Sequence, residues 1–79
     1  MRLSDIIPSQ SAIISDIDKD SKIKRRLQDL GIIQNTLITC IAKSPLGDPS
    51  AYRIRQTIIA LRKQDAEKII IREVNPWIK

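Results

Sequence analysis

Residues 43–49 read Lys-Ser-Pro-Leu-Gly-Asp-Pro and separate the two segments of the chain that most resemble β-strands. Their serine, proline and glycine suit the first, second and fourth positions of a type I turn. Asp48 precedes a proline, which disfavours a helical backbone at Asp48 and directs the chain into an extended segment. The stretch 43–49 therefore predicts a stiff hairpin connection. Turn chemistry does not account for Leu46, an apolar side chain at the tip of an exposed loop.

The segments on both sides of this turn are rich in residues that favour strands. In the segment 36–43 both faces are apolar, and one of them carries Leu37 and Ile41. A strand with two apolar faces lies at the centre of a sheet or beneath a partner. The segment 51–56 alternates more regularly, and we expect Tyr52 to point into the core.

One segment has the periodicity of an amphipathic helix. Within residues 20–30, Ile23, Leu27 and Leu30 are spaced to form a single apolar stripe. Gly31 follows at the position where a left-handed residue commonly ends a helix. We therefore predict one helix over 20–30 with its apolar stripe on the core.

The rest of the chain adds short strands and helical turns. A first strand is expected over 12–17, where alternation places Ile17 on the same face as Ile13. Further strands are expected over 58–61 and 69–74, with helical turns over 1–7 and 63–68 and a tail over 75–79. Five short strands with one helix favour a mainly β fold, a small SH3-like barrel that avoids exposed sheet edges.

The composition describes a small domain with an excess of positive charge. Seventy-nine residues suit a single domain, 1–79, with an aliphatic core, because only 3% of the residues are aromatic. The net charge of +5 favours an acidic partner, a nucleic acid or an anionic membrane face, or serves solubility alone. A lone cysteine, no apolar run of about 20 residues and no secretory pattern predict a cytoplasmic protein that does not span the membrane.

Catalysis is not expected from these residues. The chain has no histidine and no phosphate-binding glycine loop, and Cys40 lies on the face assigned to the core. We therefore expect no enzymatic activity, no catalytic residue and no cofactor. Asp16, Asp18 and Asp20 superficially suggest a calcium loop, but the glycine and glutamate that such a loop needs are missing. We expect no metal site.

A nucleic-acid-binding barrel is the main alternative from the residues alone. Arg53, Arg55, Arg62 and Lys63 form a basic stripe that suits a phosphate backbone. Single-stranded nucleic acids also need aromatic stacking platforms, and Tyr52 is expected to point inward. Nucleic acid is therefore the second choice, and we do not expect it as a partner.

The motifs that carry a family resemblance run through nearly the whole chain. In order they are Leu3-Ser4-Asp5-Ile6, Pro8, Ala12-x-Ile14-x-x-Ile17, Arg26-Leu27-x-x-Leu30-Gly31-Ile32, Ser44-Pro45-Leu46-Gly47-Asp48-Pro49, Ala60-Leu61-Arg62-x-x-Asp65-Ala66 and Ile69-x-Ile71. Together they resemble the FeoA family, small proteins that accompany the bacterial ferrous-iron transporter FeoB. The stretch 44–49 is the most specific of them. The chain departs from the family at three usual glycine positions, where it has Ser9, Asn35 and Gln56.

The resemblance implies an SH3-like barrel without known enzymatic activity that acts in ferrous iron uptake. Its implied partner is the cytoplasmic GTPase part of FeoB, which it regulates or assembles, at the inner face of the membrane. Transition-metal binding is a property of the family as a whole. The barrel also resembles the C-terminal domain of iron-dependent repressors of the DtxR type, which keeps peptide binding as an alternative.

Three groups of residues are predicted to bind the partner. The first is the turn, which presents Leu46 in a stiff frame and so limits the ordering cost of binding. The second is the basic helix face, and the third is the second apolar face of the strand 36–43, which suits a partner groove or weak self-association. The predicted residues are Pro45, Leu46, Gly47, Asp48, Arg25, Arg26, Leu37 and Ile41.

Overall fold

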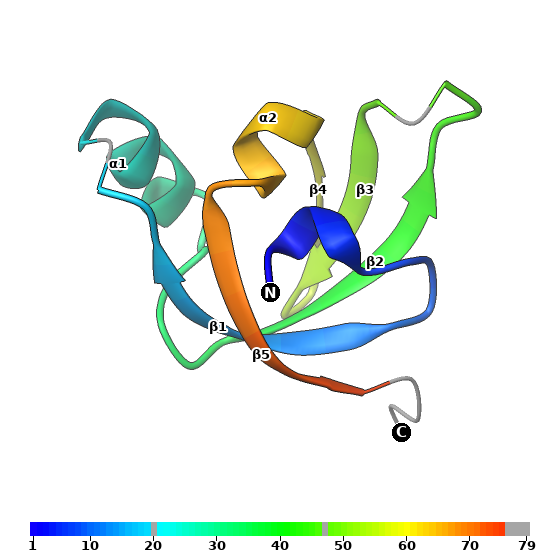
Figure 1. Cartoon of the computed structure of the whole chain (residues 1–79), viewed down its shortest axis with the longest axis horizontal. Coiled ribbons are helices and arrows are strands. Elements are labelled where there is room, and N and C mark those ends of the chain that lie inside the picture. Colours follow the sequence, from blue (N-terminus) through cyan, green and yellow to red (C-terminus); the bar gives the residue numbers. More distant parts are fainter. Residues whose placement is uncertain (20, 47, 76–79) are drawn as a thin grey trace.

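The computed structural model of the chain describes residues 1–19, 21–46 and 48–75. In chain order the elements are the 3-10 helix η1 (Leu3–Asp5), β1 (Ser11–Ile17), α1 (Ser21–Asp29), β2 (Leu37–Lys43), β3 (Ser50–Ile54), β4 (Thr57–Leu61), α2 (Lys63–Ala66) and β5 (Ile69–Asn75). The strands form one antiparallel sheet in the order β4-β3-β2-β1-β5, with α1 at one end of the molecule (Figure 1). The mainly β fold with short helical turns is confirmed. The expected absence of sheet edges is wrong, because β4 and β5 end the sheet on its two sides.

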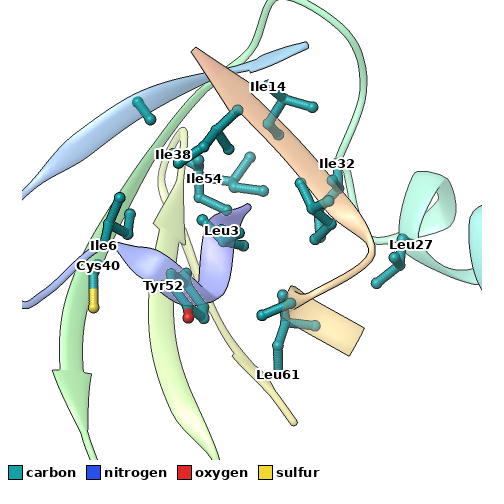
Figure 2. Close-up of a cluster of buried hydrophobic side chains, with 14 of the residues drawn as sticks. Leu3, Ile6, Ile14, Leu27, Ile32, Ile38, Cys40, Tyr52, Ile54 and Leu61 are labelled. Atoms are coloured by element: carbon teal, nitrogen blue, oxygen red, sulfur yellow. The ribbon is translucent and has the colours of Figure 1, made fainter. Parts of the chain in front are cut away.

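The core is aliphatic and lies between the curved sheet, η1 and the helices (Figure 2). Tyr52 is its only aromatic side chain among the described residues, and it is 1% exposed, as predicted. The buried apolar residues are Leu3, Ile6, Ala12, Ile14, Ile17, Leu27, Ile32, Ile38, Cys40, Tyr52, Ile54, Leu61, Ala66, Ile69 and Ile71.

The predicted helix is present, but its apolar stripe is shorter than expected. Leu27 is buried and Ile23 packs against the core at partial exposure. Leu30 is exposed, because α1 ends at Asp29 and Leu30 belongs to the turn that follows the helix. Gly31 has the expected left-handed backbone, with φ at +99°. Nowhere in the described ranges is a helix long and apolar enough to cross a membrane.

A β-bulge corrects the predicted faces of β1. Ile14 pairs with Ile71 and Asp16 with Ile70, so Ser15 is an extra residue in β1 relative to β5. The extra residue changes the alternation of side chains along the strand. Ile17 therefore joins the core together with Ile14, instead of sharing the outer face with Ile13.

Turns that lack the usual glycines adopt left-handed backbone at other residue types. Ser9 and Asn35 have φ values of 74° and 67°. Asn35 tolerates this conformation well, and its N–H donates to the Ile14 carbonyl at 2.7 Å. In the β3–β4 turn, Arg55 has the positive φ, 56°. Gln56, which occupies the position of the family's usual glycine, is not among the residues with positive φ.

Candidate partner-binding surface

The loop between β2 and β3 is closed by hydrogen bonds at its base. The Ser44 N–H donates to the Pro49 carbonyl at 3.2 Å, and the Asp48 N–H donates to the Ser44 hydroxyl oxygen at 2.8 Å. Leu46 lies at the tip and is 94% exposed, the highest value among the large exposed apolar side chains. Gly47 lies outside the described residues, so the type I turn stays a prediction.

A longer-range bond ties this loop to α2. The Asp48 Oδ1 accepts a hydrogen bond from the Lys63 N–H at 2.9 Å, and Lys63 is the first residue of α2. The residue at the N-cap position, Arg62, supplies no such bond from its own side chain. Asp48 therefore caps the N-terminus of α2, although it is distant from α2 in the sequence. The same hydrogen bond restrains the loop that carries Leu46.

Removing this bond is expected to loosen the loop. Asp48→Ala should lower the free energy of unfolding by about 0.5–2 kcal/mol, the usual effect of losing a cap. Amide hydrogen exchange at Lys63 should accelerate in the same variant. Asp48→Asn is the matched control, because its amide oxygen still accepts the bond, and it should change stability by less than about 0.5 kcal/mol. Equal urea midpoints for the alanine variant and the wild type would contradict the anchoring role.

A small hollow lies at the base of the loop and contains two lysines. Its volume is about 230 Å³, and it is lined by Ser4, Lys43, Ser50, Tyr52 and Lys63. The Lys43 Nζ donates to the Ser4 carbonyl at 3.3 Å, which holds the ammonium beside the hollow. Two cations and three hydroxyls suit a carboxylate better than a cation or an apolar group. Sequence reasoning missed this group because Ser4 and Lys43 are 39 residues apart.

The polar ends of Cys40 and Tyr52 point toward the loop end of the β2–β3 hairpin (Figure 2). Burial raises the pKa of the Cys40 thiol above its ordinary 9.0, an effect that the nearby Lys43 charge only partly offsets. Burial likewise raises the pKa of the Tyr52 phenol above its ordinary 10.0, against a smaller opposing effect of the Ser50 hydroxyl. Both groups are therefore neutral near pH 7, and the buried Cys40 is unsuited to act as a nucleophile.

The basic residues predicted on the helix lie far from the loop. Arg25 and Arg26 are exposed on α1, which lies at the opposite end of the molecule from the β2–β3 loop (Figure 1). The Arg26 Nη2 lies 3.5 Å from the Asp65 Oδ2, and the Asp65 side chain is buried. Arg26 thus links α1 to α2. The structure does not combine the helix arginines and Leu46 into one small surface.

The two apolar residues predicted on β2 lie on the outer side of the sheet. Leu37 is exposed and pairs across strands with Ile13 of β1, whereas Ile41 is half-buried. Ile41 is also an extra residue relative to β3, because Cys40 pairs with Tyr52 and Ala42 with Ala51. Those two apolar side chains remain candidates for a contact separate from the loop.

The described carboxylates of the supposed calcium run are engaged in local bonds. The Asp16 Oδ1 accepts from the Ile17 N–H at 2.8 Å, and the Asp18 Oδ1 pairs with the Arg2 guanidinium at 2.7 Å. Asp20 lies outside the described residues. No group of three or more acidic or thiol side chains that could hold a metal ion occurs in the described part of the chain.

Comparison with known proteins places the chain in one family. A family model described as the FeoA domain matches residues 1–73. The Fe(2+) transport protein A/Fe(2+) transporter FeoB fusion protein of Porphyromonas gingivalis is 33% identical over 69 residues, which make up 87% of this chain and 8% of that protein. This chain therefore spans only a small part of that relative.

Solved structures agree in both family and fold. The NMR structure of a FeoA-like protein from Clostridium acetobutylicum is 30% identical with a TM-score of 0.84, over 100% of this chain and 88% of that one. The zinc complex of Stenotrophomonas maltophilia FeoA, described as a prokaryotic SH3 domain protein, is 28% identical with a TM-score of 0.81, over 91% of this chain and 89% of that one. The SH3-like expectation is thereby confirmed. Because the family model covers almost the whole chain, this protein belongs to the FeoA domain family.

Proposed function

We propose that this protein is a non-enzymatic accessory of ferrous iron uptake that binds the cytoplasmic GTPase part of a FeoB-type transporter. Its role there is to regulate or assemble the transporter at the inner face of the membrane. Support comes from a relative in which a region similar to this chain and a FeoB transporter share one polypeptide. Domains that are fused in one protein commonly act on each other when they occur as separate chains, so the fusion favours FeoB as the partner.

The observation that carries this proposal is the exposure of Leu46 on an anchored loop. An apolar side chain that is 94% exposed gains little in the free protein and becomes useful when a partner covers it. The bond between Asp48 and Lys63 restrains the loop beforehand, which reduces the entropy lost on binding. Lys43 and Lys63 beside the loop favour a partner that offers a carboxylate next to an apolar recess.

The test is a binding measurement with the cytoplasmic domain of the FeoB of the same organism. Leu46→Asp should weaken binding by about 30-fold or more, the effect of losing a central apolar anchor. The free energy of unfolding should stay within about 0.5 kcal/mol of the wild type, because the side chain makes few contacts in the free protein. Ile33→Asp is the matched control, since Ile33 is also exposed but lies beside Lys24 and Gln28 of α1, and α1 is at the opposite end of the molecule from the loop (Figure 1). Equal affinities of Leu46→Asp and wild type would remove the loop from the interface.

A GTP hydrolysis assay in the same samples separates the two roles within the proposal. Regulation predicts a change in the hydrolysis rate that Leu46→Asp abolishes. Assembly predicts binding without a change in rate. Weak self-association through Leu37 and Ile41 is a further part of the proposal, and Leu37→Asp should reduce it in sedimentation experiments without weakening the binding of FeoB.

A further inference from the structure

The sheet has two edge strands, and one of them, β5, is protected. The Ile71 N–H donates to the Met1 carbonyl at 2.9 Å, and Arg2 forms a β-bridge with Ile70. The pairing of β5 with β1 is interrupted by register shifts, and Glu73 has a left-handed backbone with φ at 54°. A covered edge, bulges and charged side chains are the means by which natural sheets prevent pairing with other chains.

The other edge strand, β4, has none of these protections. Its five residues, 57–61, read Thr-Ile-Ile-Ala-Leu and include no charge and no proline. They pair with β3 in a regular register without a bulge. Across the described residues, no hydrogen bond reaches β4 from any element other than β3. This strand therefore keeps a row of backbone groups available for another strand.

The hairpin geometry identifies the free backbone groups. A two-residue turn, 55–56, joins β3 to β4, so Ile54 and Thr57 form the hydrogen-bonded pair that closes the hairpin. Hydrogen-bonded and non-hydrogen-bonded pairs alternate along an antiparallel ladder. The N–H and C=O groups of Ile58 and Ala60 therefore point away from β3 toward the open edge. The Ile58 side chain is 58% exposed beside them.

Positive charges surround this apolar edge on both sides. Arg55 precedes β4, Arg62 and Lys63 follow it, and Arg53 is the cross-strand neighbour of Ile58. All four side chains are exposed, and none of these four described residues forms an ion pair. An apolar strand with cationic ends is complementary to an extended segment with an apolar centre and acidic ends.

The same charges disfavour a second copy of this chain at the edge. Antiparallel pairing of two β4 strands centred on Ile59 brings Arg62 and Lys63, which follow one strand, toward Arg55, which precedes the other, at both ends of the pair. Like charges that are brought close together repel each other, and this repulsion destabilises such a pair. The edge is therefore better suited to a different protein.

We infer that β4 binds an extended segment of a partner protein by strand addition, and that this segment has a β-forming apolar centre flanked by acidic residues. Main-chain bonds to Ile58 and Ala60 supply the affinity, and the flanking arginines and lysine select the acidic ends. The inference deepens the proposed function, because a FeoB-type partner is the expected source of the segment. The edge itself can be tested without that partner.

The probe is a synthetic nine-residue peptide with alternating valine and threonine at its five central positions and two glutamates at each end. Titration into isotope-labelled protein should give saturable shifts at the Ile58 and Ala60 amides and slow their hydrogen exchange. A control peptide with lysines in place of the glutamates should bind at least about 10-fold more weakly, with the difference shrinking as salt is raised. Shifts that map away from β4, or equal binding of both peptides, would overturn the inference.

The matched variants are Ala60→Pro and Ala60→Thr. Proline removes a donor that faces the open edge and leaves the bonds between β3 and β4 in place. The proline variant should bind the peptide about 10-fold or more weakly than the wild type. The threonine variant keeps the N–H donor and should preserve binding. If Ala60→Pro does not fold, two N-methylated versions of the peptide answer the same question. In one version the methylated backbone nitrogens are those that face β4, and in the other they are those that face away from it. Only one of these two peptides should lose binding, and retention by both would overturn strand addition.

Two further outcomes distinguish this inference from the proposed function. Suppose that Leu46→Asp no longer binds the FeoB domain while Ala60→Pro binds it with wild-type affinity. The strand-addition inference then fails and the proposed function stands. If the wild type binds the acidic peptide at β4 but not the FeoB domain, the edge is a binding site and the transporter is the wrong partner. Self-association that Ala60→Pro abolishes would make a second copy the occupant and overturn the inference.

Discussion

Replacing Tyr52 with alanine is expected to remove a large share of the free energy of unfolding of the protein. The ring is 1% exposed and pairs across strands with Cys40 of β2 and Ile59 of β4. Deleting a buried aromatic side chain costs about 3–5 kcal/mol, because the surrounding core fills the cavity only partly. A domain of this length has a total stability of about 4–12 kcal/mol, so the loss is a large share of it.

The measurement is guanidinium denaturation followed by circular dichroism. Tyr52→Phe is the control, because it keeps the ring and removes only the hydroxyl beside Ser50, which should cost about 1 kcal/mol or less. The alanine variant should lose at least about 2 kcal/mol more than the phenylalanine variant. If the two variants have the same midpoint, the ring is not central to the core.

Alkaline pH is expected to destabilise the protein through Cys40 and Tyr52. Burial raises the pKa of both groups above their ordinary values of 9.0 and 10.0, which apply to the unfolded chain. Above these values the unfolded chain loses its protons first, so ionisation favours the unfolded state. The stabilising effect is complete below about pH 9 and declines as pH rises toward the folded-state pKa values. The slope reaches at most about 1.4 kcal/mol per pH unit for each group.

Urea midpoints from about pH 8 to about pH 11 test this pH dependence. Cys40→Ala should remove the part that begins near pH 9, and Tyr52→Phe the part that begins near pH 10. All other groups are the same in the variants and the wild type, so the comparison with wild type isolates the two buried groups. A wild-type decline that both variants share in full would contradict the assignment to Cys40 and Tyr52.

The local structure was predictable where short-range rules act on neighbouring residues. The hairpin connection between β2 and β3, the helix over Ile23 and Leu27 with Gly31 after it, and the inward orientation of Tyr52 all follow from residue type and spacing. These features depend on backbone preferences and on the period of apolar residues, which a sequence displays directly. Leu46 was also recognised as an exposed apolar residue from the turn alone.

Other features depended on contacts between distant segments and could not be read from the chain. The extra residue at Ser15 brings Ile17 into the core, because pairing with β5 determines where β1 bulges. The bond from Asp48 to Lys63, like the hollow with two lysines beside it, exists only after α2 folds against the loop. Asp65 was part of a recognised motif, yet its burial beside Arg26 depends on how α1 and α2 are placed.

Residue types and their spacing were enough to predict the small β-rich fold, its aliphatic core, its positive charge and the exposed Leu46 in the β2–β3 loop. Three features became visible only in the folded chain: the loop is anchored to α2, the helix arginines lie far from the loop (Figure 1), and β4 is an edge strand of the sheet. The physical reason is that residue types set local backbone and burial preferences, whereas strand order and long-range hydrogen bonds determine which surfaces remain free. For the loop between β2 and β3, the local residues favour a turn, whereas its anchoring comes from the hydrogen bond between Asp48 and the first residue of α2.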